Sequence, residues 1–176
     1  QLMQNKGRVV ARDIHDHKVE IIRETAKRLD LSIIDAQMYD AVKIDDNYIE
    51  KADKVLVDAP CTGLGIIRRK PDIKWARSTE DKAEITRLQS KILNAASKYV
   101  KPGGTLVYST CTIEPEENVE MVKKFISENT GFEMTDISGL LPKKLKSDTA
   151  KDGFVQLYPN VHGIDGFFIA RMRRRS

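Results

Sequence analysis

Short apolar runs alternate with helix-like segments along most of this 176-residue chain, and this alternation limits the fold more than any other feature. Four runs rich in aliphatic residues predict strands at 8–13, 31–36, 54–58 and 105–109. Between them, apolar residues recur at helical spacing, first at Val19, Ile22, Ala26 and Leu29 and later at Ile85, Leu88, Ile92, Leu93, Ala96 and Tyr99. Strands that alternate with helices form α/β folds, so we expect a mostly parallel sheet with helices on both faces.

The two ends of the chain add fewer elements. Pro115 predicts the start of another helix, and strands are predicted near 132–137 and at 166–171, where a β-hairpin could close the sheet. Residues 1–7 end in a glycine and have the pattern of the last turn of a helix with its cap. A chain of this length suits one domain, so 1–176 is predicted to form a single unit.

The composition is that of a globular protein, with 40% hydrophobic residues and a mean hydropathy of −0.43. No run approaches the roughly 20 apolar residues that span a bilayer, and no signal-peptide pattern opens the chain, so we expect a cytoplasmic protein with no membrane partner. The net charge of +4 and a pI near 9.0 favour a polyanionic partner, although a solvated basic surface would give the same totals.

Three aspartates stand just after predicted strands, where α/β sheets bind their ligands. They are Asp13, Asp40 and Asp58. An acid at such a strand end can accept hydrogen bonds from a ribose diol or an adenine amine. Each aspartate alone is more typical of a turn or a helix cap. Their common placement favours a nucleoside cofactor over that alternative.

Cys61 and Cys111 are too few for a disulfide framework or a thiolate zinc site, and no metal site is predicted. They follow the third and fourth predicted strands, fifty residues apart, so adjacent parallel strands would bring both thiols to one rim of the sheet. A thiolate there could attack an electrophilic carbon if nearby cations or helix amides lowered its pKa. Two buried structural thiols are the alternative. The Pro60-Cys61-Thr62-Gly63 loop favours the functional interpretation.

The motifs around these cysteines resemble those of Sun-type RNA cytosine-5 methyltransferases. The signature loop corresponds to Asp58-Ala59-Pro60-Cys61-Thr62-Gly63-Leu64-Gly65, continuing through Arg68-Arg69-Lys70-Pro71-Asp72-Ile73-Lys74-Trp75. The second cysteine motif corresponds to Tyr108-Ser109-Thr110-Cys111-Thr112-Ile113 with Glu114, Glu116, Glu117 and Asn118, and the closing strand to His162-Gly163 with Asp165-Gly166-Phe167-Phe168. The resemblance covers essentially the whole chain. It implies a Rossmann-like fold that depends on S-adenosyl-L-methionine.

The resemblance also implies roles for the two thiols. Carbon 5 of cytosine is a poor nucleophile, so the family adds a thiolate to carbon 6 before the methyl group reaches carbon 5. Cys111 would make this covalent adduct, and Cys61 would help to release the product. The residues themselves leave open which cysteine attacks.

The remaining implied roles concern the cofactor and the RNA. Asp13 would bind the cofactor ribose, Asp40 its adenine end, and Asp58 would lie between its methionine part and the target base. The Pro60 carbonyl would hold the cytosine amine. The target base must leave any stack to reach Cys111, so phosphate contacts beside the pocket are expected. The candidates are Arg68, Arg69, Lys70 and Lys74, and the tail Arg171, Arg173, Arg174 and Arg175, for which a solvated charge run is an equal alternative. The implied partner is RNA, specifically small-subunit ribosomal RNA.

The 176 residues do not contain a strand and a Pro-Gly-Gly-Lys cofactor loop that family members carry ahead of the matched region. We therefore expect a C-terminal catalytic domain truncated at its N-terminus, without its first strand and without an RNA-binding domain, which binds the cofactor weakly and could be inactive. The strands at 8–13 and 54–58 would then be unpaired on one side unless the sheet closes or another segment or chain associates. A non-catalytic RNA-binding module is the competing hypothesis. A nicotinamide-binding protein is disfavoured because no Gly-x-Gly-x-x-Gly follows a strand.

Overall fold

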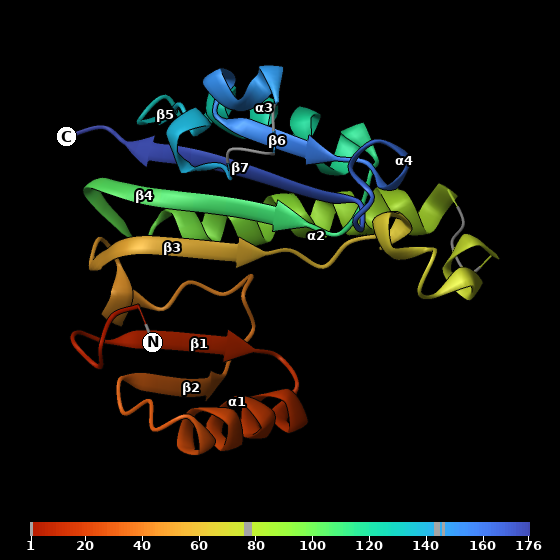
Figure 1. The fold of residues 1–176 in the computed structure, drawn as a ribbon. Helices are drawn as coiled ribbons and strands as arrows, with labels where there is room; N and C mark the ends of the chain where they lie inside the picture. The colour runs from red at the N-terminus through yellow and green to blue at the C-terminus, as the bar shows by residue number, and fades with distance from the viewer. Residues whose placement is uncertain (1, 76–78, 143–144, 146) are drawn as a thin grey trace. The chain divides into compact units, whose positions relative to one another are not determined.

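The computed structural model describes residues 2–75, 79–142, 145 and 147–176, and at residues 74, 75, 79 and 80 the backbone alone. The chain divides into two compact units, Gln1–Lys43 and Ile44–Ser176. Each unit contains a sheet of its own (Figure 1). None of the helices in the described part of the chain combines the length and the apolarity that a bilayer crossing requires.

The first unit is a two-stranded parallel sheet with one helix packed on it. β1 (Val9–Asp13) pairs with β2 (Ile34–Met38), and α1 (Asp16–Arg28) connects the two strands. α1 buries Val19 and Ala26, two of the positions whose spacing predicted the helix. The predicted order of strand, helix and strand is confirmed for this unit.

β2 begins later than the strand predicted at 31–36, because the residues before it end α1. The Leu31 amide donates to the Ala26 carbonyl (2.8 Å), and the Asp30 amide donates to the Lys27 carbonyl (3.1 Å). Asp30 has the left-handed φ of 51° that such a helix end requires. These two bonds form a Schellman motif, so Leu31 terminates the helix and does not pair in the sheet.

The prediction that residues 1–7 end a helix is wrong for the described residues 2–7. Residues 2–5 form a turn, in which the Lys6 amide donates to the Met3 carbonyl (2.9 Å). Gln4 and Asn5 have φ values of 50° and 54°, which a right-handed helix does not allow. Gly7, with φ 90°, does adopt the glycine conformation that the pattern suggested.

The second unit contains a sheet in the order β3-β4-β7-β5, with β6 also paired to β7. Its strands are β3 (Ala52–Asp58), β4 (Val100–Thr110), β5 (Phe132–Met134), β6 (Phe154–Leu157) and β7 (Phe167–Arg174). β3 and β4 are parallel, whereas β7 is antiparallel to β4, β5 and β6. The α/β class is confirmed, but the sheet is mixed rather than mostly parallel because the last part of the chain returns through hairpins. The two strands predicted near the end of the chain correspond to β5 and β7, which pair antiparallel, whereas β6, which also pairs with β7, was not predicted.

Shorter elements connect these strands. They are the 3-10 helices η1 (Asp46–Tyr48), η2 (Leu64–Ile66), η3 (Pro71–Trp75), η4 (Pro115–Glu117), η5 (Ser138–Leu140) and η6 (Asp148–Asp152), and the one-turn helix α4 (Pro159–His162). β4 starts earlier than the strand predicted at 105–109, because Val100 already pairs with Ala52 and residues 101–104 form an irregularity within the ladder. The predicted helix start at Pro115 is a 3-10 turn that leads into the next α-helix.

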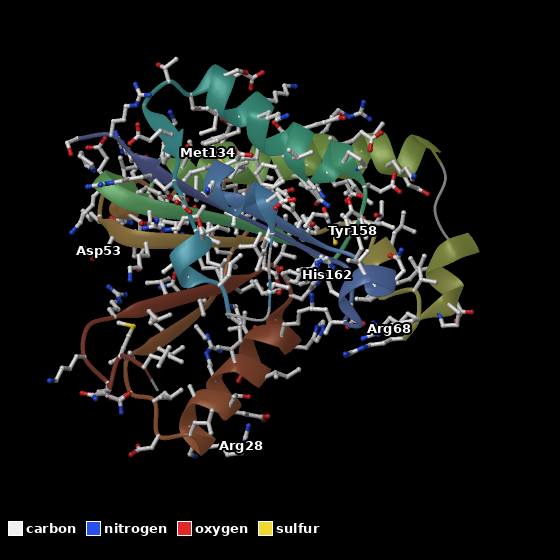
Figure 2. All side chains as sticks on the ribbon, turned by 45° about the horizontal axis from the view of Figure 1, so that its top comes forward. Arg28, Asp53, Arg68, Met134, Tyr158 and His162 are labelled. Carbon is white, nitrogen blue, oxygen red and sulfur yellow. The ribbon has the colours of Figure 1, made fainter. Side chains whose placement is uncertain are left out.

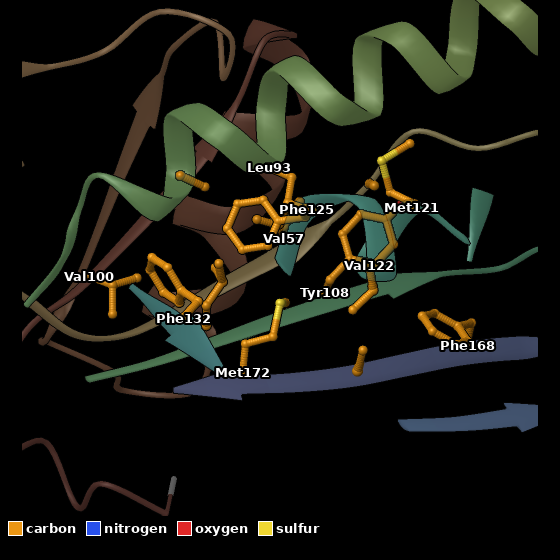
Figure 3. Packing of buried hydrophobic residues seen from close by; sticks show 14 residues of the cluster. Val57, Leu93, Val100, Tyr108, Met121, Val122, Phe125, Phe132, Phe168 and Met172 are labelled. Carbon is orange, nitrogen blue, oxygen red and sulfur yellow. The ribbon is translucent and has the colours of Figure 1, made fainter. Parts of the chain in front are cut away.

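The main core lies between the sheet of the second unit and its two long helices, α2 (Thr79–Ser97) and α3 (Val119–Glu128) (Figure 3). Leu93 of α2, Phe125 of α3 and alternate residues of β4 and β7 fill it. The other face of β7 packs Phe167 and Ile169 against a smaller cluster made by η6, β6 and Ile137. On that face, residues of β6 and β7 pack against Ile137 and against Ala150 of η6, and not against a long helix of the described residues.

β1 and β3 each have one edge without a partner among the described residues. β1 pairs only with β2, and β3 pairs only with β4. On β3, Leu56 points away from the core and is 69% exposed. The expectation that these two strands have unpaired ladders therefore holds in the described residues.

Candidate active site

The parallel pairing of β3 with β4 brings the two cysteines together. Asp58 and Ser109 are register partners at the ends of these strands, and each cysteine follows a short distance later. The Sγ atoms of Cys61 and Cys111 lie 3.2 Å apart, and both side chains are partly buried. The predicted meeting of the two thiols at one rim is confirmed.

The pKa values of the two thiols are shifted in opposite directions. A hydrogen bond from the Cys61 thiol lowers the pKa of Cys111 to about 7, against the opposing effects of burial and of the Asp58 charge. The pKa of Cys61 is raised above its usual range, first by this same hydrogen bond and then by burial. An unperturbed cysteine has a pKa of about 8.5. The shifts in pKa therefore favour the thiolate form at Cys111 and the protonated form at Cys61.

A buried carboxylate, Glu117 of η4, lies beneath both cysteine loops. Its Oε2 accepts hydrogen bonds from the Thr62 amide (3.0 Å) and from Nε2 of Gln89 (2.8 Å). Its Oε1 accepts from the Thr62 hydroxyl (2.6 Å), which also contacts the Thr112 hydroxyl (2.8 Å). Gln89 donates further to the Pro60 carbonyl (2.8 Å). The residue after each cysteine is thus tied to the same group.

Asn118 supports the Cys111 loop from the next position. Its Nδ2 donates to the Thr112 carbonyl (3.0 Å) and to Oε1 of Gln156 (2.7 Å), and its Oδ1 accepts from Thr110. Asn118 and Thr110 are fully buried. Buried polar groups with complete hydrogen bonding fix one geometry, so the backbone on both sides of Cys111 is held firmly.

Sequence reasoning gave no role to Glu117 or Gln89. One signal for Gln89 was available, since it lies four residues after Ile85 and four before Leu93, on the apolar stripe of α2. A polar residue at such a position must find partners inside the protein. For Glu117, no periodic signal existed, because it lies in a short 3-10 turn and the sequence did not show which side chains of this turn point into the protein.

A third loop packs on the two that carry the cysteines. The Gly65 amide donates to the Cys111 carbonyl (3.0 Å), and the Gly166 amide donates to the Gly65 carbonyl (2.8 Å). A Cβ on Gly65 would lie 2.2 Å from the Gly166 carbonyl oxygen, so only glycine fits there. The three segments that carried the sequence resemblance are therefore in direct contact with one another.

The predicted phosphate-binding arginines are engaged within the protein. Arg68 and Arg69 both form ion pairs with Asp165, at 2.6 and 2.9 Å, and Arg68 also donates to the Gly163 carbonyl (3.3 Å). Figure 2 shows Arg68 near the segment of Tyr158 and His162. The side chains of Arg68 and Arg69 are 45% and 69% exposed. The side chain of Lys74 lies outside the described residues.

Three of the tail arginines also have partners along β7. Arg171 donates to the Thr135 hydroxyl (2.9 Å), Arg174 contacts Glu50 and the Val100 carbonyl, and Arg175 pairs with Glu133 (3.3 Å). These contacts join β7 to its neighbours in the second unit. These three residues therefore have partners within the protein.

The three strand-end aspartates fall into different units. Asp13 and Asp40 lie at the same end of the first sheet, after β1 and β2, where Asp13 accepts from the His15 amide (2.9 Å) and Asp40 from the Val42 amide (3.2 Å). These are turn contacts of the kind that the alternative interpretation predicted. Asp58 belongs to the cysteine site, where the Ser109 hydroxyl donates to it (3.4 Å). Among the described residues, no group of three or more His, Cys, Asp or Glu could hold a metal ion.

Solved structures define the class of protein to which this fold belongs. The crystal structure of NSun6 from Pyrococcus horikoshii with SFG matches with a TM-score of 0.85 and 35% identity, over 100% of this chain and 44% of that one. The structure of PH0851 matches with a TM-score of 0.89 and 32% identity, over 98% of this chain and 38% of that one. The fold is the Rossmann-like fold of methyltransferases.

Sequence comparison then gives the family. The family model "16S rRNA methyltransferase RsmB/F" matches residues 1–173. "Probable ribosomal RNA small subunit methyltransferase B" of Bacillus subtilis (strain 168) is 45% identical, over 100% of this chain and 40% of the relative. "Ribosomal RNA small subunit methyltransferase F" of Escherichia coli O6:H1 is 33% identical, over 98% of this chain and 36% of the relative. The chain belongs to the RsmB/F family of 16S rRNA methyltransferases, and it spans about two fifths of the length of these relatives.

Proposed function

We propose that this chain is the catalytic domain of an enzyme that methylates carbon 5 of a cytosine in RNA, with small-subunit ribosomal RNA as substrate. The observation that carries the proposal is the distance of 3.2 Å between the Sγ atoms of Cys61 and Cys111, which follow the adjacent parallel strands β3 and β4. A family of 16S rRNA methyltransferases supports the choice of RNA. Because the substrate belongs to the ribosome, we also propose a cytoplasmic location.

In the proposed reaction, the Cys111 thiolate adds to carbon 6 of the cytosine, and the electron pair of the carbon 5–carbon 6 double bond becomes available at carbon 5. Carbon 5 then takes the methyl group. Removal of the proton from carbon 5 restores the double bond and breaks the bond between carbon 6 and Cys111. Cys61 stabilises the leaving thiolate, because its sulfur lies 3.2 Å from that of Cys111 and its S–H can donate to it.

The proposed cofactor is S-adenosylmethionine, which supplies the methyl group when bound. The residues present fit a nucleoside, since Asp13 and Asp40 offer carboxylate acceptors at one end of a parallel pair of strands. We propose that Asp13 binds the ribose and Asp40 the adenine end, and that Asp58 faces the reacting groups. The NSun6 structure with SFG, an analogue of S-adenosylmethionine, supports this choice of cofactor.

Two further contacts are proposed for the RNA. The Pro60 carbonyl accepts from Gln89, and its second lone pair could accept the amine of the target cytosine. Arg68 and Arg69 each present five N–H donors, of which Asp165 occupies only some, so their exposed edges can contact phosphate while the ion pairs persist. Lys74 is proposed for the same role.

The proposal is tested by trapping the covalent adduct. The chain is incubated with S-adenosylmethionine and a small-subunit rRNA transcript that contains 5-fluorocytidine, which has no removable proton at carbon 5. Peptide mass spectrometry then locates the adduct. An adduct at Cys111 that is absent in Cys111→Ser supports the proposal, and an adduct at Cys61 reverses the two roles. RNA binding without any adduct favours the non-catalytic RNA-binding module.

A matched variant tests the role of Cys61. With unmodified RNA, Cys61→Ala should accumulate a Cys111 adduct that the unchanged chain releases, because the substitution removes the donor to which release is assigned. The measurement is the fraction of chain that migrates with RNA under denaturing conditions. Equal fractions in the two chains would remove Cys61 from the release step.

A further inference from the structure

The Glu117 carboxylate is only 1% exposed and belongs to no strand or long helix of the site. A buried carboxylate is costly unless donors surround it. The donors present here come from three different parts of the chain: the loop after β3, the loop after β4, and α2. No other described carboxylate is as fully removed from water.

Glu117 contacts the residue that directly follows each of the two cysteines. Thr62 follows Cys61 and donates both its amide (3.0 Å) and its hydroxyl (2.6 Å). Thr112 follows Cys111, and its hydroxyl lies 3.4 Å from the same Oε1 and 2.8 Å from the Thr62 hydroxyl. One side chain therefore fixes the residue next to each thiol.

Gln89 extends this arrangement to the proposed contact for the base. Its Nε2 bridges Glu117 and the Pro60 carbonyl, both at 2.8 Å. Its Oε1 is buried without a hydrogen-bond partner in the described structure. The opposite amide orientation would place that oxygen against two acceptors, so the bridge to Glu117 and Pro60 sets the orientation.

We propose that Glu117 is a positioning residue, which holds the Cys61 loop against the Cys111 loop and thereby sets the distance between the two sulfur atoms. Gln89 carries the same restraint to the Pro60 carbonyl. The importance of Glu117 for catalysis rests on the proposed function, whereas its effect on the two thiols does not.

The charge and the contacts of Glu117 act on Cys111 in opposite directions, and this makes the proposal testable. The negative charge of Glu117 raises the pKa of Cys111, but this effect is smaller than the lowering by the Cys61 hydrogen bond. Glu117→Ala removes the charge and also frees the Cys61 loop, so the pKa of Cys111 should rise. Glu117→Gln removes only the charge, since its amide can face the two threonine hydroxyls, so the pKa should stay equal or fall.

The experiment measures the rate at which iodoacetamide alkylates each cysteine as a function of pH, with peptide mass spectrometry to separate the two sites. The midpoint for Cys111 should lie near pH 7 in the unchanged chain and move towards about 8.5, the value of a free cysteine, in Glu117→Ala. Glu116→Ala is the matched control, because Glu116 is exposed on the same turn. A folded Glu117→Ala chain with an unchanged midpoint overturns the proposal.

A second variant covers the case in which Glu117→Ala does not fold. Thr62→Val keeps the shape and the backbone amide but removes the hydroxyl between Glu117 and Thr112. Its Cys111 midpoint should shift in the same direction by a smaller amount. If Glu117→Ala is unfolded and Thr62→Val has the midpoint of the unchanged chain, the positioning role is likewise rejected.

Alkylation needs neither RNA nor cofactor, so its result is independent of the adduct experiment. If the unchanged chain forms the adduct, Glu117→Ala should lower kcat on the order of 10²-fold with little change in KM, as expected for reacting groups displaced by about 1 Å. Glu117→Gln should recover most of this loss. A purely structural role would lower stability and leave both the pH profile and the kcat of the folded fraction unchanged.

Discussion

At the scale of single residues, the proximity of Cys61 and Cys111 could be predicted from the sequence, but the difference between their pKa values could not. Positions after adjacent strands were enough to predict that the thiols meet. Which thiol carries the proton depends on the direction of one hydrogen bond and on unequal burial. The contacts of Thr62 and Thr112 with Glu117, beside the two thiols, are likewise not indicated by any spacing in the sequence.

Removing the hydrogen bond from Cys61 should change how Cys111 responds to pH. The thiolate is the reactive form, so alkylation of Cys111 should rise through about pH 7 in the unchanged chain. Cys61→Ala removes the donor, and the midpoint should move up towards about 8.5. Cys61→Ser keeps an O–H donor, so its midpoint should stay below that of Cys61→Ala. Equal midpoints in the two variants would show that the hydrogen bond does not control the thiolate.

At the scale of elements, the site depends on loops that touch through their backbones. Gly65 lies between the Cys111 carbonyl and Gly166, and an added methyl group would overlap backbone atoms of both. Gly65→Ala should therefore destabilise the chain by at least about 2 kcal/mol, measured by urea unfolding. Gly139→Ala, which would meet nothing within 4 Å, is the control and should change stability by less than about 0.5 kcal/mol. Similar values for both variants would contradict the close packing.

The end of α1 offers an opposite, stabilising change. Asp30 occupies the left-handed position of the Schellman motif with φ 51°, where a residue other than glycine is strained. Asp30→Gly should raise the free energy of unfolding by about 1 kcal/mol. Asp30→Ala keeps the strain and should bring no gain. Thermal unfolding followed by circular dichroism compares the two variants, and a gain with alanine would exclude the conformational explanation.

The same helix end shows why strand boundaries were harder to predict than strands. The apolar residues from Leu31 onward fit a strand by composition, but Leu31 is used to close α1. Similarly, 101–104 contain the proline and glycines of a loop, yet β4 continues across them from Val100. Periodicity identifies the buried face of an element, whereas its ends depend on individual backbone hydrogen bonds.

At the scale of the whole molecule, β1 and β3 each have one edge that is unpaired among the described residues. We propose that β3 pairs with another segment or chain, because its edge is unpaired and Leu56 is 69% exposed on it. Leu56→Lys should reduce self-association, measured by sedimentation velocity over a range of concentrations. Leu140→Lys is the control, since Leu140 is 68% exposed in η5 and away from the strands. An equal effect of the two substitutions would indicate nonspecific hydrophobic association.

Most of the overall architecture could be predicted from sequence, including the alternation of elements and the helix faces, but the strand β6 was not predicted. The mixed character of the sheet was missed, because the direction of β7 beside β4 depends on the path of the last forty residues and not on any local pattern. The ion pairs of Arg68 and Arg69 could not be predicted either, because Asp165, which pairs with both, lies nearly a hundred residues away in sequence.

The dependence of both cysteine loops on Glu117 has a consequence for protein engineering. Transplanting only the Pro-Cys and Thr-Cys motifs into another α/β scaffold would carry over two reactive atoms without the groups that hold them apart at a fixed spacing. The smallest transferable module also includes η4 for Glu117 and the turn of α2 that presents Gln89. A designer should treat these separate stretches as one inseparable part.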